Sequence, residues 1–235
     1  MSNNDFPTAV KNFFEQHPEA VSSQQRTDDW RLARMGRFTG SEIHKLMTTQ
    51  RGGKGFGKTA ISYIYAKQAE RNVPAYILRN SNTRELYYER VNGGSKATRY
   101  GTEWEADARI SFERWAKTKT YDCSFVYYGD DMGASPDALV CEDGKLGVLE
   151  IKCPFDPAIF RLYVNEIKDG DTLKSVRPEY WWQMQMEMLC VGADYGYFFA
   201  YDAMQTPFKH IVKVTTDTAA QVMIKERVKE ALKYG

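Results

Sequence analysis

The sequence predicts an α/β fold in which a central mixed β-sheet is flanked by helices. Three features of the 235-residue chain predict it. The first half carries mainly helical patterns, three strand-like segments follow between residues 121 and 152, and a helix separates these from two further strands. Helices that lie before, between and after the strands are typical of a sheet covered by helices.

The first half has apolar residues at helical spacing, divided by glycine, asparagine and serine. In order, we expect a short amphipathic helix at 5–16, a polar linker at 17–27, a helical stretch from Asp28, a break at 38–41, a helix at 41–50 capped by Ser41, a glycine-rich loop at 52–57, a helix at 59–72, a region that includes a loop at 80–99, and a strong helix at 102–117. The last helix has an inner face that includes Trp104, Ala108 and Phe112.

The second half contains the strands. In order, we expect a strand at 121–128, hairpin arms at 133–140 and 146–152 joined by a turn at 141–144, an excursion of helix and loop at 156–176, a helix at 178–191 that begins at Pro178 and ends at Gly192, strands at 195–202 and 208–215, and a C-terminal helix capped by Thr216 or Asp217. Within the hairpin turn, Asp143-Gly144 is a dipeptide that favours tight turns.

No linker rich in Pro, Gly or Ser divides the chain after residue 27. We therefore expect a single domain over residues 1–235. Its core would span 28–215, preceded by an N-terminal helix and linker at 1–27 and followed by a C-terminal helix at 216–235.

Composition restricts the compartment and the partners. No apolar run approaches the roughly 18 residues that a membrane-spanning helix needs, so we expect no membrane association. The N-terminus lacks the pattern of a signal peptide. The four cysteines show no CxxC spacing, which favours reduced thiols in a cytoplasmic protein over a zinc or iron–sulfur site. Because the net charge is only +1, any binding of nucleic acid must come from local patches.

Two carboxylates and a lysine meet on the predicted hairpin. Strand side chains alternate, so Glu150 and Lys152 project from the same face of an otherwise apolar arm. Asp137, placed rigidly after Pro136 on the neighbouring arm, can complete the cluster. Charges on an apolar strand must be solvated, paired or metal-bound. Such a cluster can hold Mg²⁺ on a phosphodiester and polarise a water beside it, although similar residues also occur by chance as solvated charges.

Residues 52–59 match the phosphate-binding pattern GxxxxGK[ST]. A P-loop needs a strand before it and a helix after it, because backbone N–H groups and a helix N-terminus converge on the phosphates. The preceding segment here has a helical pattern, which disfavours an ATPase. Two simpler interpretations stay open: a flexible basic loop, or a loop whose Arg51, Lys54 and Lys58 contact a nucleic acid backbone.

Four short blocks extend the hairpin signal along the chain: WEADAR at 104–109, SPDA at 135–138, LEIKCP at 149–154 and EYWWQMQ at 179–185. With an upstream block, WRLARMGRFTGSE at 30–42, they resemble the lambda-exonuclease/YqaJ-type viral recombinase family of the PD-(D/E)xK nuclease superfamily. The blocks span residues 30–190, and four of them in order are far more specific than any one. The resemblance implies a PD-(D/E)xK nuclease-like fold.

The resemblance implies a role for each matching residue at a metal site. Asp137 and Glu150 would bind the metal, with the backbone carbonyl of Ile151 as a third oxygen. Glu105 would be a further acid, bound directly or through water. Lys152 would orient or deprotonate the attacking water, or stabilise charge at the phosphate. For Glu105 the simpler alternative is a surface ion pair with Arg109 at i+4.

Further residues would surround that site. Gln183 would position the lysine or the water. Tyr180 lies at i−3 from it, on the same helix face and beside the metal, unless it packs in the core with Trp181 and Met184. The resemblance also implies that Arg34 and Ser41 bind the terminal phosphate, with Ser135 as a further phosphate contact. The simpler alternatives are that Arg34 is a solvated helix residue and that Ser41 is a plain N-cap.

A 5′-to-3′ exonuclease that acts on the ends of linear double-stranded DNA is the activity that the resemblance implies. It would release mononucleotides and leave 3′ single strands for phage-type recombination by single-strand annealing. The resemblance further implies two Mg²⁺ ions, for which Mn²⁺ can substitute, a homotrimer, a single-strand annealing protein as partner, and a phage or prophage protein in the bacterial cytoplasm. The alternatives are a structure- or sequence-specific endonuclease with the same metal site, a non-catalytic DNA-binding module, and the disfavoured ATPase.

Overall fold

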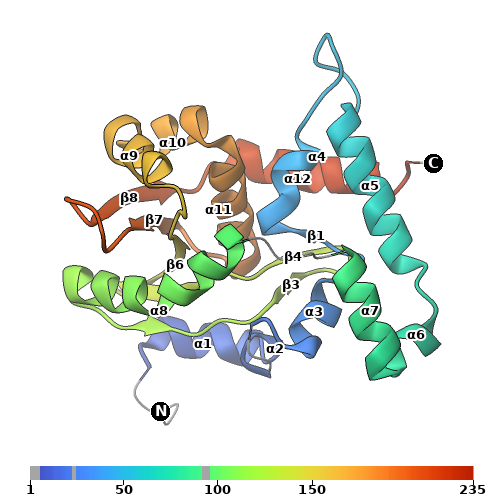
Figure 1. The fold of residues 1–235 in the computed structure, drawn as a ribbon, viewed down its shortest axis with the longest axis horizontal. Helices are drawn as coiled ribbons and strands as arrows, with labels where there is room; N and C mark the ends of the chain where they lie inside the picture. Colours follow the sequence, from blue (N-terminus) through green and yellow to red (C-terminus); the bar gives the residue numbers. More distant parts are fainter. Residues whose placement is uncertain (1–5, 23–24, 92–95, 235) are drawn as a thin grey trace.

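The computed structural model describes residues 6–22, 25–91 and 96–234 (Figure 1). Its helices are α1 (Thr8–Gln16), α2 (Glu19–Ser22), α3 (Asp28–Arg34), the 3-10 helix η2 (Gly40–Glu42), α4 (Ile43–Leu46), α5 (Lys58–Arg71), α6 (Ala75–Arg79), α7 (Ser81–Val91), α8 (Lys96–Ala116), α9 (Pro157–Glu166), α10 (Gly170–Val176), α11 (Pro178–Val191) and α12 (Thr218–Ala231). Its strands are β1 (Phe38–Thr39), β2 (Thr120–Tyr121), β3 (Val126–Tyr128), β4 (Met132–Ala134), β5 (Ala138–Glu142), β6 (Lys145–Lys152), β7 (Tyr195–Tyr201) and β8 (Lys209–Thr215).

The main sheet has five strands in the order β2-β5-β6-β7-β8. Strands β6 and β7 are parallel, and the other neighbours in this sheet are antiparallel. A second sheet has the order β1-β4-β3 and is also mixed. Helices lie on both sides of the strands (Figure 1). The predicted α/β fold with a central mixed sheet is therefore confirmed.

Two of the predicted strands are each divided between the two sheets. The segment 121–128 forms the end of β2 in the main sheet and then β3 in the small one, and the first hairpin arm forms β4 and then β5. Pro136 lies at the second division, where a residue without an N–H cannot continue a ladder. Gln25 connects the two points where these strands pass from one sheet to the other. Its Nε2 donates to the carbonyl of Cys123 at 2.9 Å and to that of Pro136 at 2.7 Å.

The predicted hairpin turn is confirmed. Asp143 and Gly144 both have positive φ angles, 51° and 75°, as a two-residue turn with the twist of the strands requires. The register pairs Ala138 with Leu149, so that Asp137, one residue earlier, comes opposite Glu150. Strand pairing thus brings the backbones of the two acidic residues opposite each other.

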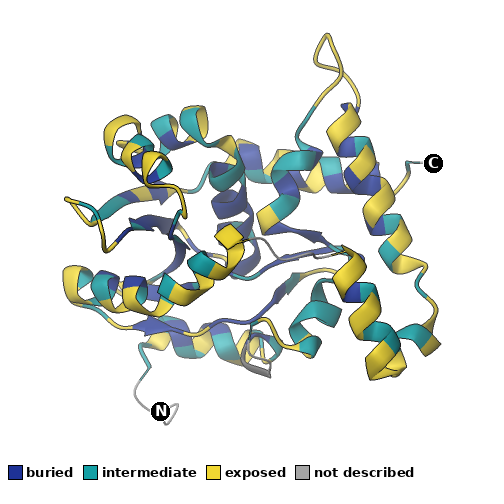
Figure 2. Ribbon diagram, viewed as in Figure 1, coloured by how far each residue is buried: buried dark blue, intermediate teal, exposed yellow. Residues whose placement is uncertain are grey.

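The strand β6 separates two parts of the core. Leu149 and Ile151 belong to a cluster that includes Phe112 of α8, whereas Val148 belongs to the cluster that includes Met184 of α11. Because side chains alternate along a strand, Glu150 and Lys152 project toward the α11 side. Strand β6 and helix α11 are among the most continuously buried elements (Figure 2). Glu150 is buried between them, whereas Lys152 at the end of the strand is partly exposed.

Two predictions about the N-terminal half were wrong in detail, and a third stays a prediction. The region 80–99 is helical over α7 and the first turn of α8, and the only place left for its predicted loop, residues 92–95, lies outside the described part. Ser41 does not cap a helix over 41–50, because it lies within η2 and is followed by only one helical turn, α4. The linker at 17–27 contains α2 and also supplies Gln25 to the sheet junction.

Several expected helix boundaries are confirmed. Pro178 begins α11, which ends at Gly192 with a φ of 70°. Asp217 caps α12 by accepting a hydrogen bond from the Ala220 amide at 3.0 Å. The loop at 52–57 projects from the molecule between α4 and α5 (Figure 1), and it lacks the preceding strand that a P-loop requires. No helix in the described ranges is long and apolar enough to span a membrane.

We predict that Gly133→Ala destabilises the protein by about 1–3 kcal/mol. A Cβ at this position on β4 would come within 2.4 Å of the Phe125 ring and 2.5 Å of the Val126 carbonyl oxygen. Urea unfolding measures the change. The control is Gly170→Ala, whose Cβ would meet Val214 at an ordinary 3.6 Å and should cost no more than about 0.5 kcal/mol. Equal stabilities of the two variants would contradict the close packing at β4.

Candidate active site

Lys152 and Glu150 are in direct contact, and Asp137 is hydrogen-bonded to the backbone of Ile151, which lies between them on β6. The Ile151 amide donates to Asp137 Oδ2 at 2.7 Å. Lys152 Nζ forms an ion pair with Glu150 Oε1. Within a strand the N–H and C=O of one residue face the same neighbouring strand. The Ile151 carbonyl is thus directed toward the edge where Asp137 lies.

Burial makes the charges of this cluster interdependent. Burial, together with the negative charges of Glu150 and Glu105, raises the pKa of Asp137 well above its usual value. Burial also acts to lower the pKa of Lys152, but the charges of Glu150 and Asp137 outweigh it and raise that pKa. The raised pKa favours the charged ammonium form of Lys152 in this arrangement.

Helix α11 covers the cluster with one polar face. Gln183 Oε1 accepts a hydrogen bond from Lys152 Nζ at 3.4 Å, and Gln183 Nε2 donates to Glu187 Oε1 at 2.8 Å. Because the Nε2 group faces a carboxylate, the amide oxygen is directed at the lysine. The Tyr180 ring centroid lies 4.5 Å from Lys152 Nζ, and the ring stacks on Phe198. Tyr180 also packs against the core cluster that includes Trp181 and Met184, so it has both the core contacts and the contact with the lysine.

Glu187 is a fully buried acid beneath the cluster. Its pKa is raised well above the usual value by burial and by the charge of Glu150. The atoms Glu150 Oε2 and Glu187 Oε2 are both buried and have no hydrogen-bond partner. A proton held by Glu187 reduces the repulsion between these two groups.

Glu105 reaches the same region from α8. Its partner is Arg26, whose Nη2 donates to Glu105 Oε2. The alternative pair with Arg109 is wrong, since Arg109 donates to Thr120 and Asp122. Arg26 follows Gln25 in the segment expected to be a linker, and it has a positive φ of 69°. A single arginine in a polar stretch gives no sequence signal of this role.

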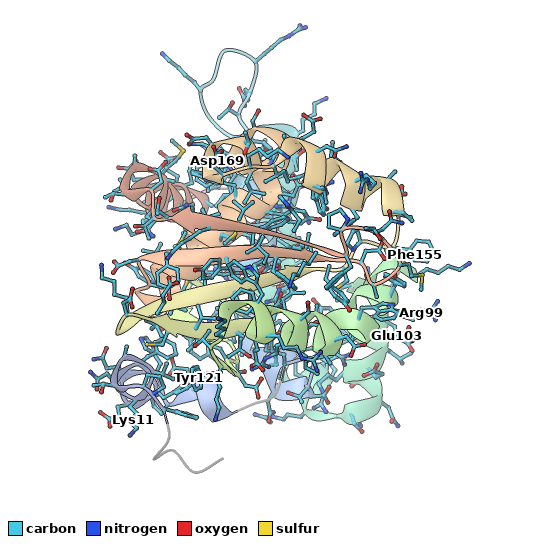
Figure 3. All side chains as sticks on the ribbon, turned by 90° about the vertical axis from the view of Figure 1, so that its left-hand side faces the viewer. Lys11, Arg99, Glu103, Tyr121, Phe155 and Asp169 are labelled. Carbon is cyan, nitrogen blue, oxygen red and sulfur yellow. The ribbon has the colours of Figure 1, made fainter. Side chains whose placement is uncertain are left out.

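A cavity of about 420 Å³ joins these groups, and we call it the carboxylate cavity. The site residues that line it are Glu105, Asp137, Glu150, Ile151, Lys152 and Tyr180. Arg26 and the first turns of α8, including Thr98 and Thr102, complete the wall. Figure 3 shows Glu103, a second acid on α8 two residues before Glu105, with Arg99 and Phe155 at this end of the helix. Unlike Glu105, Glu103 does not line the cavity.

A second cavity, of about 360 Å³, lies around Arg34, and we call it the arginine cavity. Arg34 Nη2 donates to Ser41 Oγ at 3.0 Å, and its guanidinium lies 4.3 Å from the Trp30 ring centroid. Trp30 Nε1 donates to Ser135 Oγ at 2.8 Å. The three residues predicted to bind phosphate are therefore connected through Trp30, although Ser41 contributes from η2 and not from the start of a long helix.

The two cavities share part of their walls. Arg26, Thr98 and Thr102 line both. The arginine cavity also contains residues that the sequence patterns did not single out, among them Lys67, Glu70 and Tyr88. Lys67 is buried and forms an ion pair with Glu70 at 3.0 Å, and it lies on a helix whose apolar pattern gave no indication of a buried charge.

The donor set suits a hard divalent cation. Among the described residues, no group of three or more His, Cys, Asp or Glu side chains is arranged to hold a metal. One oxygen each of Asp137, Glu150 and Glu105 is paired with an N–H or a cation. However, Glu150 Oε2 is a buried oxygen with an unmet hydrogen bond beside a second carboxyl group. An oxygen-only set of this kind matches the preference of Mg²⁺ or Mn²⁺.

Comparisons with known proteins identify the family. The model of the YqaJ-like viral recombinase domain matches residues 29–194. The chain belongs to the YqaJ-like viral recombinase family. A search of curated proteins found no match for it.

Solved structures share its fold. An alkaline exonuclease from Laribacter hongkongensis is 23% identical, with a TM-score of 0.67 over 88% of this chain and 91% of that one. A phage-related exonuclease from Haemophilus somnus is 17% identical, with a TM-score of 0.60 over 84% and 92%. The family member described here thus has the fold of these exonucleases.

We predict that the metal-free protein loses stability as the pH rises above the usual carboxyl range, and that Glu187→Gln reduces this loss. The folded-state pKa of Glu187 is raised above 4.5. The contribution of Glu187 to the free energy of unfolding is therefore complete below pH 4.5 and is lost as the pH rises through the folded-state pKa. The substitution should make the fall of the free energy of unfolding with pH less steep, by up to about 1.4 kcal/mol per pH unit. Urea unfolding in EDTA at several pH values measures this dependence.

Glu226→Gln, at an exposed position on α12, is the matched control and should leave the slope unchanged. A slope that is the same in the parent and in Glu187→Gln would show that Glu187 is charged in the folded protein.

Proposed function

We propose that this protein is a divalent-metal-dependent 5′-to-3′ exonuclease that degrades one strand of linear double-stranded DNA to mononucleotides. The observation that carries the proposal is the wall shared by the arginine cavity and the carboxylate cavity. A terminal phosphate held at Arg34 would place the nearest phosphodiester toward Asp137 and Glu150. An enzyme that holds the 5′ end and cleaves at a fixed short distance from it releases mononucleotides or short fragments from that end.

The site residues divide the work. Asp137, Glu150, the Ile151 carbonyl and Glu105 would hold the metal, which supplies charge neutralisation at the phosphate and an activated water. Lys152, whose pKa is raised, donates to a non-bridging phosphate oxygen and stabilises its growing charge. Gln183 holds the ammonium group in place through its amide oxygen. Tyr180 forms the wall beneath the lysine and faces the DNA.

A relative supports the product that we propose. The Laribacter hongkongensis exonuclease has also been solved in complex with dAMP, a deoxynucleoside monophosphate. The size of the carboxylate cavity, about 420 Å³, is suited to one nucleotide. The proposal also includes the remaining expectations of the family: a single domain over 1–235, a homotrimer around the DNA, a single-strand annealing protein as partner, and a phage or prophage origin in the bacterial cytoplasm.

Digestion of a 5′-phosphorylated linear duplex in Mg²⁺ tests the proposal. The duplex is labelled separately at each end and compared with a closed circle. We expect the 5′ label to appear as mononucleotide, and we expect Lys152→Ala to slow this release by about 10²- to 10³-fold because one preorganised donor is lost. Nicking or linearisation of the circle would instead identify an endonuclease. Undiminished release by Lys152→Ala would place the chemistry elsewhere.

We predict that Arg34→Lys lowers the preference for phosphorylated 5′ ends by about 10- to 100-fold, since a lysine cannot reproduce the bidentate contact of the guanidinium. The ratio of kcat/KM for 5′-phosphate and 5′-hydroxyl duplexes measures this preference. Arg90→Lys, at an exposed position on α7, is the control. If Arg34→Lys lowers kcat/KM by the same factor for 5′-phosphate and 5′-hydroxyl duplexes, Arg34 supports the fold or binds DNA in general and does not recognise the terminal phosphate.

A further inference from the structure

Five aromatic rings form a continuous row that starts at the carboxylate cavity. In order they are Phe155, Tyr100, Trp104, Tyr201 and Phe208, with neighbouring ring centroids separated by 5.5, 6.1, 6.5 and 6.1 Å. We call them the aromatic row. Phe155 lines the carboxylate cavity, while Tyr201 and Phe208 line a separate cavity of about 290 Å³, here the outer cavity. The row thus connects the proposed site of cleavage with a distant hollow.

Core packing accounts for the middle of the row but not for its ends. Trp104 and Tyr201 pack against the buried cluster beneath α8. Phe155 and Phe208 belong to neither buried cluster, and they are 56% and 45% exposed. Large exposed rings that extend a row from a cavity present apolar faces to solvent, which indicates a surface that binds a ligand.

Positive charges accompany the rings. Arg114 and Lys209 line the outer cavity, against a single carboxylate there, that of Asp107. Lys209 Nζ lies 5.3 Å from the centroid of Phe208. At the other end, Arg99 is exposed beside Tyr100, and Figure 3 shows Arg99 and Phe155 at the same end of α8. The row therefore has cations at both ends, while the carboxylates of Glu103 and Asp202 lie near its middle.

We propose that the aromatic row binds single-stranded DNA, namely the strand that remains after its complement is digested. Bases stack on aromatic side chains only when they are released from a duplex, and nearby cations hold the backbone. A duplex keeps its bases covered and gains little from exposed rings. Continuity with the carboxylate cavity places this surface where a newly unpaired strand first emerges. The identity of that strand rests on the proposed exonuclease function, whereas the binding itself does not.

Fluorescence anisotropy with a labelled oligothymidylate tests the row in the full-length Lys152→Ala protein in EDTA, so that no DNA is consumed. Phe208→Ala should weaken binding by roughly 5- to 150-fold, the range for the loss of one stacked base. Lys209→Gln should lower the slope of log affinity against log salt by about 0.7. A duplex closed at both ends by hairpins should compete poorly.

Matched controls lie at exposed positions outside the row. Tyr76→Ala removes a ring that is 69% exposed on α6, and Lys225→Gln removes a cation on α12; both should bind as the parent does. Equal melting temperatures show that all variants fold. The proposal is overturned if the parent does not bind oligothymidylate, if Phe208→Ala binds as tightly as the parent, or if Tyr76→Ala loses as much affinity.

Digestion of the linear duplex by a chain with Lys152 intact separates this proposal from the exonuclease. Release of the first nucleotide should be unchanged in Phe208→Ala, because Phe208 lies in the outer cavity. If the protein binds oligothymidylate through the aromatic row but digests no DNA, the binding proposal stands and the exonuclease proposal is wrong. If it digests the duplex but does not bind oligothymidylate through the row, the exonuclease proposal stands and the binding proposal is wrong.

Discussion

The hydrogen bond from the Ile151 amide to Asp137 determines the geometry of the whole site. It fixes the first acid against the strand that carries the second acid and the lysine. It forms where the chain leaves the small sheet and enters the main one, so the fold and the site share one junction. Without strand pairing on both sides of Pro136, Asp137 would be a loop residue with freedom to turn toward solvent.

The remaining polar groups are ordered by this junction. Lys152 is paired with Glu150 on its own strand and with the Gln183 amide oxygen on α11. Glu187 then fixes the orientation of Gln183. Together these contacts connect β6 and α11 beneath the carboxylate cavity, where Glu150, Gln183 and Glu187 are buried. In such surroundings a charge must be paired, so these side chains have few alternative positions.

The sequence allowed the central cluster to be predicted because its determinants are short-range. Alternation on one strand places Glu150 beside Lys152, and a tight turn brings Asp137 opposite. The helix α11 was predictable for the same reason, from Pro178, Gly192 and an apolar run that contains Gln183. These predictions depend on residues that are close in the chain and on periodicities of two or of about 3.6.

Other parts could not be predicted because they depend on distant contacts. Gln25 and Arg26 look like linker residues, and only the folded chain shows that they hold the sheet junction and Glu105. The division of residues 121–128 and 133–140 between two sheets is likewise a property of the assembled core. The helical nature of 81–91 was hidden by polar residues that suggested a loop, since α7 has little apolar face of its own.

The separation of these contacts along the chain has a consequence for synthesis on the ribosome. Gln25 must find Pro136, which is 111 residues later, and Lys152 must find Gln183, which is 31 residues later. A growing chain that has emerged only as far as the hairpin therefore carries its acids and its lysine without the helix that positions them. Nascent or truncated chains that end before α11 thus lack Gln183 and Glu187, so the contacts that position Lys152 form only after most of the polypeptide has been made.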